Sequence, residues 1–178
     1  MTMTFFIGIK VDLKSFCNEV EPPFLKEPQE RQHITILYLG KTRLPEYLFK
    51  ELSAFLLSFK PFRIVLKGAI SIPSISKPRV IAAKVVDGEE KLKELHRALL
   101  SFCYEHKIKI YNRYVESFLP HATFARYRGK DYVYASKIAE RILKRCERIA
   151  VSVIVKKLVL YEAIDQYIKL AVFPLRKI

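Results

Sequence analysis

The 178-residue chain has no tryptophan, only five glycines and three cysteines, and no long apolar run. So few glycines nearly exclude a glycine-rich phosphate-binding loop, which places several of them close together. The cysteines Cys17, Cys103 and Cys146 are odd in number and lack C-x-x-C spacing, which argues against a disulfide framework and a zinc site. No apolar run approaches the roughly 18 residues of a membrane span, and no secretory signal pattern is visible. We therefore expect a cytoplasmic protein with reduced thiols and no membrane anchor.

Positive charge, in contrast, is abundant. The formal net charge is +14 and the isoelectric point is near 9.7. A surplus of this size favours polyanionic partners, of which nucleic acid is the first candidate. A solvated basic surface without a partner is the alternative. Apolar residues make up 51% of the chain, and its length suffices for one compact domain or two closely packed lobes.

Two segments share one pattern of histidine, apolar residue, threonine and apolar residue: H-I-T-I at 33–36 and H-A-T-F at 121–124. Alternate side chains of an extended chain share a face, so each histidine points the same way as its threonine. Two such strands would surround a small cavity with two imidazoles and two hydroxyls. Imidazoles titrate near neutral pH and hydroxyls are neutral donors for an oxyanion, which suits metal-free acid–base chemistry on a phosphate. One motif alone carries no weight, whereas two within strand-like runs are a strong signal.

Hydrophobic patterning divides the chain into strands and helices. Strands are expected at residues 5–11, 33–40, 62–68, 79–86, 118–127, 151–163 and 167–173. Helices are expected at residues 45–59, 88–106 and 133–148. The segment 71–78 contains two prolines and three serines, which predicts a loop and the seam between two halves.

The two halves look alike, because each offers a strand, an H-x-T strand followed by a helix, and further strands. We therefore expect an α+β fold in which residues 1–178 form a single bilobal domain. Two lobes related by a pseudo-twofold axis would each consist of an antiparallel sheet with helices on its outer face. The active-site cleft would lie between them.

These residues resemble the two-histidine (2H) phosphoesterase superfamily, and within it the LigT-like branch of RNA 2′,3′-cyclic phosphodiesterases, also called 2′-5′ RNA ligases. The resemblance rests on H-I-T-I-L-Y-L-G, on P-H-A-T-F-A-R, on the 88-residue separation of the two histidines and on the ending L-V-L-Y-E…A-V-F-P-L. One departure concerns the family's helix between the first strand and the first motif. The corresponding segment 12–30 is short and carries Pro22, Pro23 and Pro28, so we expect a loop or a single turn there.

The resemblance implies a mechanism without metal or nucleotide cofactor. His121 would be the general base for a water attacking the cyclic phosphate, and His33 the general acid for the departing ribose 3′ oxygen. The residues themselves require only that one imidazole starts neutral and the other protonated, and they leave open which is which. Thr35 and Thr123 would donate hydrogen bonds to the non-bridging oxygens. Arg126 would add a permanent charge and a planar fork for phosphate.

Arg126 poses a geometric question. Its position has the opposite parity to His121 and Thr123, so strict alternation would aim its side chain away from the cleft. The family pattern nevertheless places an arginine here in the site. Both hold only if the strand twists, bulges or ends between Phe124 and Arg126, or if the side chain curls round the edge. We predict that the guanidinium reaches the mouth of the cleft.

Four further residues are candidate substrate contacts. Tyr38 would stack on a base and Arg79 would reach the ligand, with packing in the core or on the surface as the alternative for each. Arg128 and Lys130 belong to the run R-Y-R-G-K, where cations interleave with an aromatic as in proteins that bind single-stranded RNA. A solvated loop is the alternative for this run. The two remaining histidines, both in the helix expected at 88–106, are assigned structural roles.

Three functions are compatible with these features. The first is hydrolysis of RNA 2′,3′-cyclic phosphate ends to 2′-phosphates by a monomer, with 2′-5′ ligation as the reverse reaction and tRNA halves among the substrates. The second is a non-catalytic RNA- or nucleotide-binding module, which would not need both imidazoles. The third is a sister 2H enzyme for a small cyclic phosphate such as an ADP-ribose derivative. The positive charge favours RNA over the third only mildly.

Overall fold

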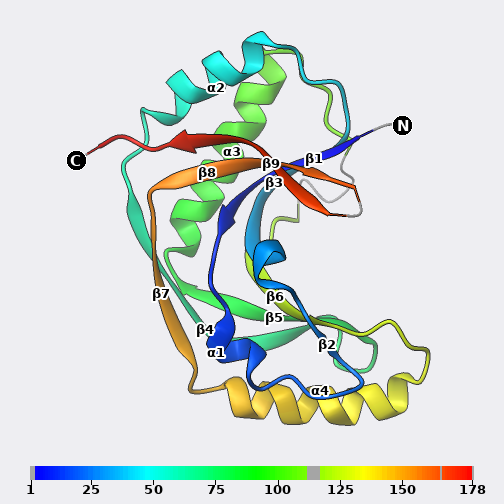
Figure 1. Ribbon diagram of the computed structural model, residues 1–178. Coiled ribbons are helices and arrows are strands. Elements are labelled where there is room, and N and C mark those ends of the chain that lie inside the picture. The colour runs from blue at the N-terminus through cyan, green and yellow to red at the C-terminus, as the bar shows by residue number, and fades with distance from the viewer. Residues whose placement is uncertain (1–2, 112–116, 165, 178) are drawn as a thin grey trace.

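The computed structural model describes residues 3–111, 117–164 and 166–177, which form a curved antiparallel sheet with helices around it (Figure 1). The strands are β1 (Thr4–Lys10), β2 (Leu25–Lys26), β3 (His33–Lys41), β4 (Phe62–Pro73), β5 (Pro78–Asp87), β6 (His121–Arg126), β7 (Ala150–Val155), β8 (Lys157–Ala163) and β9 (Tyr167–Pro174). The helices are α1 (Lys14–Cys17), α2 (Tyr47–Leu56), α3 (Glu89–Glu105) and α4 (Tyr132–Cys146), with one 3-10 turn, η1, at Gln29–Arg31. The segment 12–30 thus holds the single helical turn α1, as expected, together with β2 and η1.

The strand order is β7-β4-β5-β6-β3-β1-β8-β9, with β2 paired to β6. The two strands that carry the H-x-T motifs are neighbours at the centre, and three strands follow on either side. This order confirms the α+β class with two related halves. The halves are not separate sheets, however, because β3 and β6 join them through the antiparallel pair Ile34–Ala122.

Two sequence predictions about connections were wrong. Residues 71–78 do not separate the halves: they form the β4–β5 hairpin, in which Ser71 pairs with Ile81 and Pro73 with Pro78. Proline and serine favour hairpin turns as strongly as linkers, so their presence did not distinguish the two. The run 151–163 is also not one strand, since β7 pairs with β4 at one end of the sheet and β8 pairs with β1 and β9 at the other.

The main core lies between the sheet and the helices. Helical spacing of Leu92, Leu95 and Leu99 gives α3 a fully buried face, which packs against β3. Helix α2 contacts β9, whereas α4 contacts β4 and β5, so each half of the sheet has its own helical cover (Figure 1). No helix among the described residues is long and apolar enough to cross a bilayer. All three cysteines are buried and unpaired.

Candidate active site

The two motif histidines lie on the adjacent central strands β3 and β6. Because Ile34 and Ala122 pair in antiparallel register, His33 stands across from Thr123, and Thr35 stands across from His121. Ile34 and Ala122 themselves are fully buried on the opposite, helix-covered side, as the alternation of the motif predicts. The sheet therefore brings the two imidazoles and two hydroxyls together on one face.

Each imidazole is fixed by a main-chain carbonyl two residues earlier. His33 Nδ1 is 2.7 Å from the carbonyl oxygen of Arg31, and His121 Nδ1 is 2.7 Å from that of Leu119. A carbonyl oxygen only accepts, so Nδ1 carries the proton in both rings and Nε2 is the atom left for chemistry. His33 Nε2 lies 3.0 Å from Thr35 Oγ1, whose hydroxyl donates to it when the ring is neutral.

His33 stands among aromatic rings that come from both ends of the chain. Its ring centroid is 4.7 Å from that of Phe6, 5.3 Å from that of Tyr167 and 5.9 Å from that of Tyr161. Burial here lowers the pKa of His33 from 6.5 to about 4, and the positive charges of Arg126, His121 and Lys10 contribute in the same direction. His33 is therefore neutral in the free protein at pH 7.

Both motifs are followed by a β-bulge at the same place. The register of β1 against β3 passes from Gly8–Thr35 to Ile7–Leu37, so Ile36 is the extra residue. The register of β5 against β6 passes from Ala82–Thr123 to Ile81–Ala125, which makes Phe124 the extra residue. In each motif the bulged residue and the one after it are both buried in the main core.

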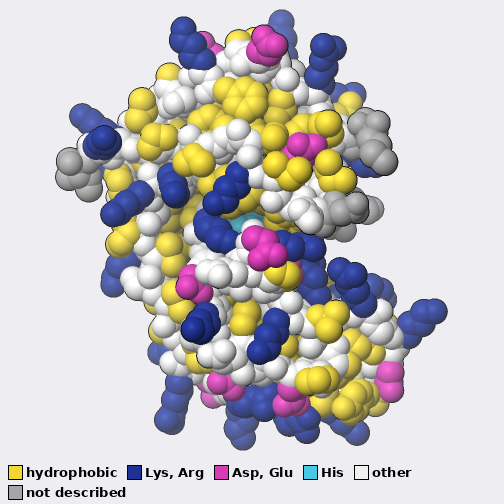
Figure 2. Space-filling model, viewed as in Figure 1, with side chains coloured by type: hydrophobic (Ala, Val, Ile, Leu, Met, Phe, Trp, Pro, Cys, Tyr) yellow, Lys and Arg dark blue, Asp and Glu magenta, His cyan; other side chains and the backbone are white. Residues whose placement is uncertain are grey.

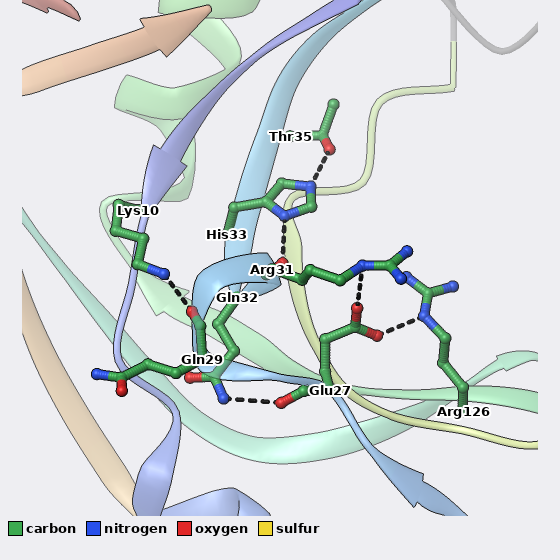
Figure 3. A network of polar contacts seen from close by, with 8 residues as sticks. All are labelled: Lys10, Glu27, Gln29, Arg31, Gln32, His33, Thr35 and Arg126. Carbon is green, nitrogen blue, oxygen red and sulfur yellow. Dashed lines mark hydrogen bonds and ion pairs between the residues drawn. The ribbon is translucent and has the colours of Figure 1, made fainter. Parts of the chain in front are cut away.

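The bulge at Phe124 determines which face of β6 carries the side chain of Arg126. One extra residue shifts the alternation, so Arg126 lies on the same face as His121 and Thr123. Its Nε donates to Oε2 of Glu27, and the Nε of Arg31 lies 3.1 Å from Oε1 of the same carboxylate. Figure 3 shows this group beside His33, with Thr35 on the far side of the imidazole. The distance between Arg126 and a bound phosphate stays a prediction.

A cavity of about 440 Å³ adjoins the pair Thr35–His121. Its remaining walls are mostly apolar and aromatic: Ile36, Tyr38, Ile72, Pro73, His96, Ser117, Phe118 and Leu119. Tyr38 is 40% exposed there, which leaves its ring available to a ligand. His96 has a structural contact, because its Nδ1 donates to the carbonyl of the bulged Ile36 at 2.7 Å and its ring stacks on Phe118.

Three predicted substrate contacts do not join the site. Arg79 lies on the helix-covered face of β5, one residue from the partner of Arg126, and its guanidinium lies over the Tyr132 ring of α4 at 5.7 Å. Arg128 and Lys130 are exposed in the loop between β6 and α4. Among the described contacts neither makes a hydrogen bond or ion pair with the motif residues. Arg79 is turned away from the site because alternate side chains of β5 point to opposite faces. Arg128 and Lys130 lie outside the site because β6 ends at Arg126 and the chain leaves the sheet before them.

Sequence analysis missed Glu27 and Arg31. Both come from the proline-containing segment 12–30 and η1, which carries no periodic pattern and where the sequence lacks the helix that the family resemblance implies. Glu27 is only 4% exposed in the folded structure, and nothing in the sequence indicates that this carboxylate is buried. Figure 2 shows Lys and Arg side chains gathered around the visible edge of a histidine on this face, with an acidic group beside them.

Comparisons with known proteins identify the family. A family model described as the 2′-5′ RNA ligase superfamily matches residues 24–166. The RNA 2′,3′-cyclic phosphodiesterase of Aquifex aeolicus (strain VF5) is 29% identical over 124 residues, which span 68% of this chain and 61% of that protein.

Solved structures share the fold over the whole chain. TT0787 of Thermus thermophilus has a TM-score of 0.66 at 20% identity, with 98% of each chain covered. LigT of E. coli complexed with 3′-AMP has a TM-score of 0.61 at 17% identity, covering 99% of this chain and 100% of that one. The paired H-x-T strands, the symmetric strand order and the family match together show that the chain belongs to the 2′-5′ RNA ligase superfamily of 2H phosphoesterases.

Proposed function

We propose that this protein hydrolyses the 2′,3′-cyclic phosphate ends of RNA to 2′-phosphates without a metal ion. The observation that supports this most directly is the matched pair of imidazoles. Both have Nδ1 bound to a main-chain carbonyl, so both present Nε2, and they stand diagonally across the β3–β6 pair from each other. A binding module has no use for two histidines held in the same tautomer.

The proposed reaction uses the two rings in turn. His121 Nε2 takes a proton from a water molecule as the water oxygen bonds to phosphorus. The bond between phosphorus and the ribose 3′ oxygen then breaks, and His33 Nε2 donates a proton to that oxygen. Thr35, Thr123 and Arg126 stabilise the charge that grows on the non-bridging oxygens. The product carries a 2′-phosphate and a free 3′ hydroxyl.

The pKa of His33 adds a requirement to this division of roles. With a pKa of about 4, His33 must gain a proton before it acts as an acid. A cyclic phosphate is an anion, and its charge beside the imidazole favours the protonated form. Binding of substrate to the variant His121→Ala, which is expected to turn it over at least about 100-fold more slowly, is therefore expected to take up protons near pH 6. Calorimetry in buffers of different ionisation enthalpy measures this uptake, and binding without proton uptake would contradict His33 as the acid.

RNA is the substrate class that we favour. The net charge of +14 attracts polyanions, and the Aquifex relative is named for RNA 2′,3′-cyclic phosphates. The aromatic walls of the cavity beside His121 suit a terminal nucleoside. Joining a cyclic end to a 5′ hydroxyl uses the same groups in reverse, so the proposal includes 2′-5′ ligation. We include tRNA halves among the proposed substrates, and we propose that the protein acts as a monomer. A small cyclic phosphate such as an ADP-ribose derivative is the second candidate, because a cavity of about 440 Å³ is in the size range of small-molecule sites.

The test is incubation with an oligonucleotide that ends in a 2′,3′-cyclic phosphate, in excess EDTA, followed by identification of the product. A 2′-phosphate supports the proposal. A 3′-phosphate, or turnover that EDTA abolishes, contradicts it. Turnover confined to mononucleotides or ADP-ribose derivatives identifies the second candidate instead.

Salt dependence tests the RNA partner separately. Affinity for single strands is expected to fall with ionic strength at a slope of about −0.7 per phosphate contacted. Salt-independent binding of oligonucleotides would contradict RNA as the substrate class.

A further inference from the structure

A buried carboxylate holds two arginines together beside the catalytic pair. Glu27 is 4% exposed, and its two oxygens contact Arg31 and Arg126 respectively. Both arginines use Nε for this contact, so the terminal Nη atoms of each lie beyond the carboxylate. Figure 3 shows the two guanidinium groups side by side. One negative charge between two positive charges leaves one surplus positive charge at this point.

Glu27 is fixed at its main chain as well. Its N–H donates to the carbonyl of the bulged Phe124 at 2.8 Å, and its carbonyl accepts from Gln32 Nε2 at 3.0 Å. The arrangement is therefore built into the fold and does not depend on freely rotating surface side chains. The carboxylate orients both arginines, and the bulge that turns Arg126 toward the cleft also anchors Glu27.

Arg31 is held on a second side by an aromatic ring. Its Cζ lies 4.5 Å from the centroid of Tyr167, and its side chain is 27% exposed. An arginine that is oriented by a carboxylate and a ring, with part of its side chain exposed, is suited to binding phosphate.

The place of this pair relative to the cavity decides which phosphate it meets. Thr35 and the cavity lie on one side of His33, and Glu27, Arg31 and Arg126 lie on the other (Figure 3). Arg126 lies on the same face of β6 as His121 and Thr123, and its charge affects the pKa of His33, so its guanidinium is within electrostatic reach of that imidazole. Arg31 lies beside Arg126 on this side of His33 and adds a second positive charge there.

We propose that Arg31 binds a second phosphate of the substrate, the phosphodiester next to the cyclic end, and that Glu27 positions Arg31 and Arg126 for the two phosphates. This inference rests on the proposed function and refines it. It makes the enzyme selective for polynucleotide ends over cyclic mononucleotides. The Arg31 side chain contributes to substrate binding and not to the orientation of His33, because His33 is oriented by the main-chain carbonyl of Arg31.

The experiment compares two substrates that differ by one nucleotide and therefore by one phosphodiester: adenosine 2′,3′-cyclic phosphate and the dinucleotide ApA with a 2′,3′-cyclic phosphate. Arg31→Met is expected to lower kcat/KM for the dinucleotide at least about tenfold, mainly through KM, and to change that for the mononucleotide by no more than about twofold. Arg97→Met, an exposed site on α3, removes the same charge as a control and is expected to change neither.

Two further variants sharpen the test. Arg31→Lys keeps the charge without the fork and is expected to retain part of the dinucleotide preference, so it serves if Arg31→Met does not fold. Glu27→Gln is expected to reduce the same preference, a ratio that a purely structural role would leave unchanged. If Arg31→Met lowers kcat/KM equally for both substrates, or for neither, the inference is overturned. If the wild-type protein turns over neither substrate, the proposed function itself fails.

Discussion

Tyr38 and Arg126 occupy equivalent positions in the two halves of the sheet. Each is the fifth residue after the histidine of its motif, and each follows a bulge that shifts the strand alternation by one residue. Both side chains therefore lie on the face of the histidines. The same backbone device presents an aromatic ring to the cavity in one half and a cation beside His33 in the other.

The two imidazoles are expected to act as a unit. His33→Ala and His121→Ala should each lower kcat on a cyclic-phosphate substrate at least about 100-fold, because each removes a proton-transfer group. The double variant should be far less than multiplicatively worse. Steady-state kinetics measures all three, with His106→Ala as a control histidine outside the site. Near-normal turnover of either single variant would remove that histidine from the mechanism.

Arg126→Lys is expected to lower kcat/KM at least about tenfold, since an ammonium group cannot contact Glu27 and a phosphate through one planar fork. Arg128→Lys, two residues further and exposed, should stay within about twofold of the wild type. The two substitutions make the same chemical change, so kinetics separates position from charge. Equal behaviour of the two variants would show that Arg126 has no special contact.

The depressed pKa of His33 predicts a specific loss of stability in acid. The unfolded chain binds a proton at this ring below pH 6.5, whereas the folded protein does so only near pH 4. The free energy of unfolding therefore falls as the pH drops from 6.5 toward 4, by up to about 3 kcal/mol from this group. Above pH 6.5 the group contributes nothing.

Urea unfolding of wild type and His33→Gln at pH 7 and pH 4.5 measures this term. The other histidines are common to both proteins, so the difference between the two pH dependences isolates His33. The wild type should lose more stability on acidification than the variant. Parallel losses would mean that His33 titrates normally in the folded protein.

Gly8 is expected to tolerate no side chain. A Cβ at this position would stand 2.9 Å from the carbonyl oxygen of Ile34 and 3.5 Å from His33 Cδ2, so β1 and β3 would have to move apart. Gly8→Ala should destabilise the protein by about 1–3 kcal/mol and lower kcat by displacing His33. Thermal unfolding and kinetics test this, with Ser101→Ala at an exposed position of α3 as a neutral control. Unchanged stability would show that the strands adjust freely.

The sequence predicted those features that depend on local periodicity. Alternation in H-I-T-I and H-A-T-F placed both motifs on strands with the polar residues together, and helical spacing predicted the buried face of α3. The bulge after Thr123 was one of several solutions to the parity of Arg126, and only the pairing with β5 selects it.

Features that depend on distant partners were not predictable in the same way. Glu27 belongs to the site because its N–H and carboxylate meet residues almost a hundred positions later. The split of 151–163 into β7 and β8 did have a local signal. Lys156 and Lys157 interrupt the alternation, and the buried residue after Val155 is Leu158.

The strands β3 and β6, which carry the two histidines, are only weakly paired with each other. Their only register pair in the described part of the chain is Ile34–Ala122, whereas the strands on either side pair over several residues. The two halves of the sheet thus share few hydrogen bonds at the line where the histidines face each other. Any ligand that touches both imidazoles spans this line, and so it acts as a crosslink between the halves as well as an occupant of the site.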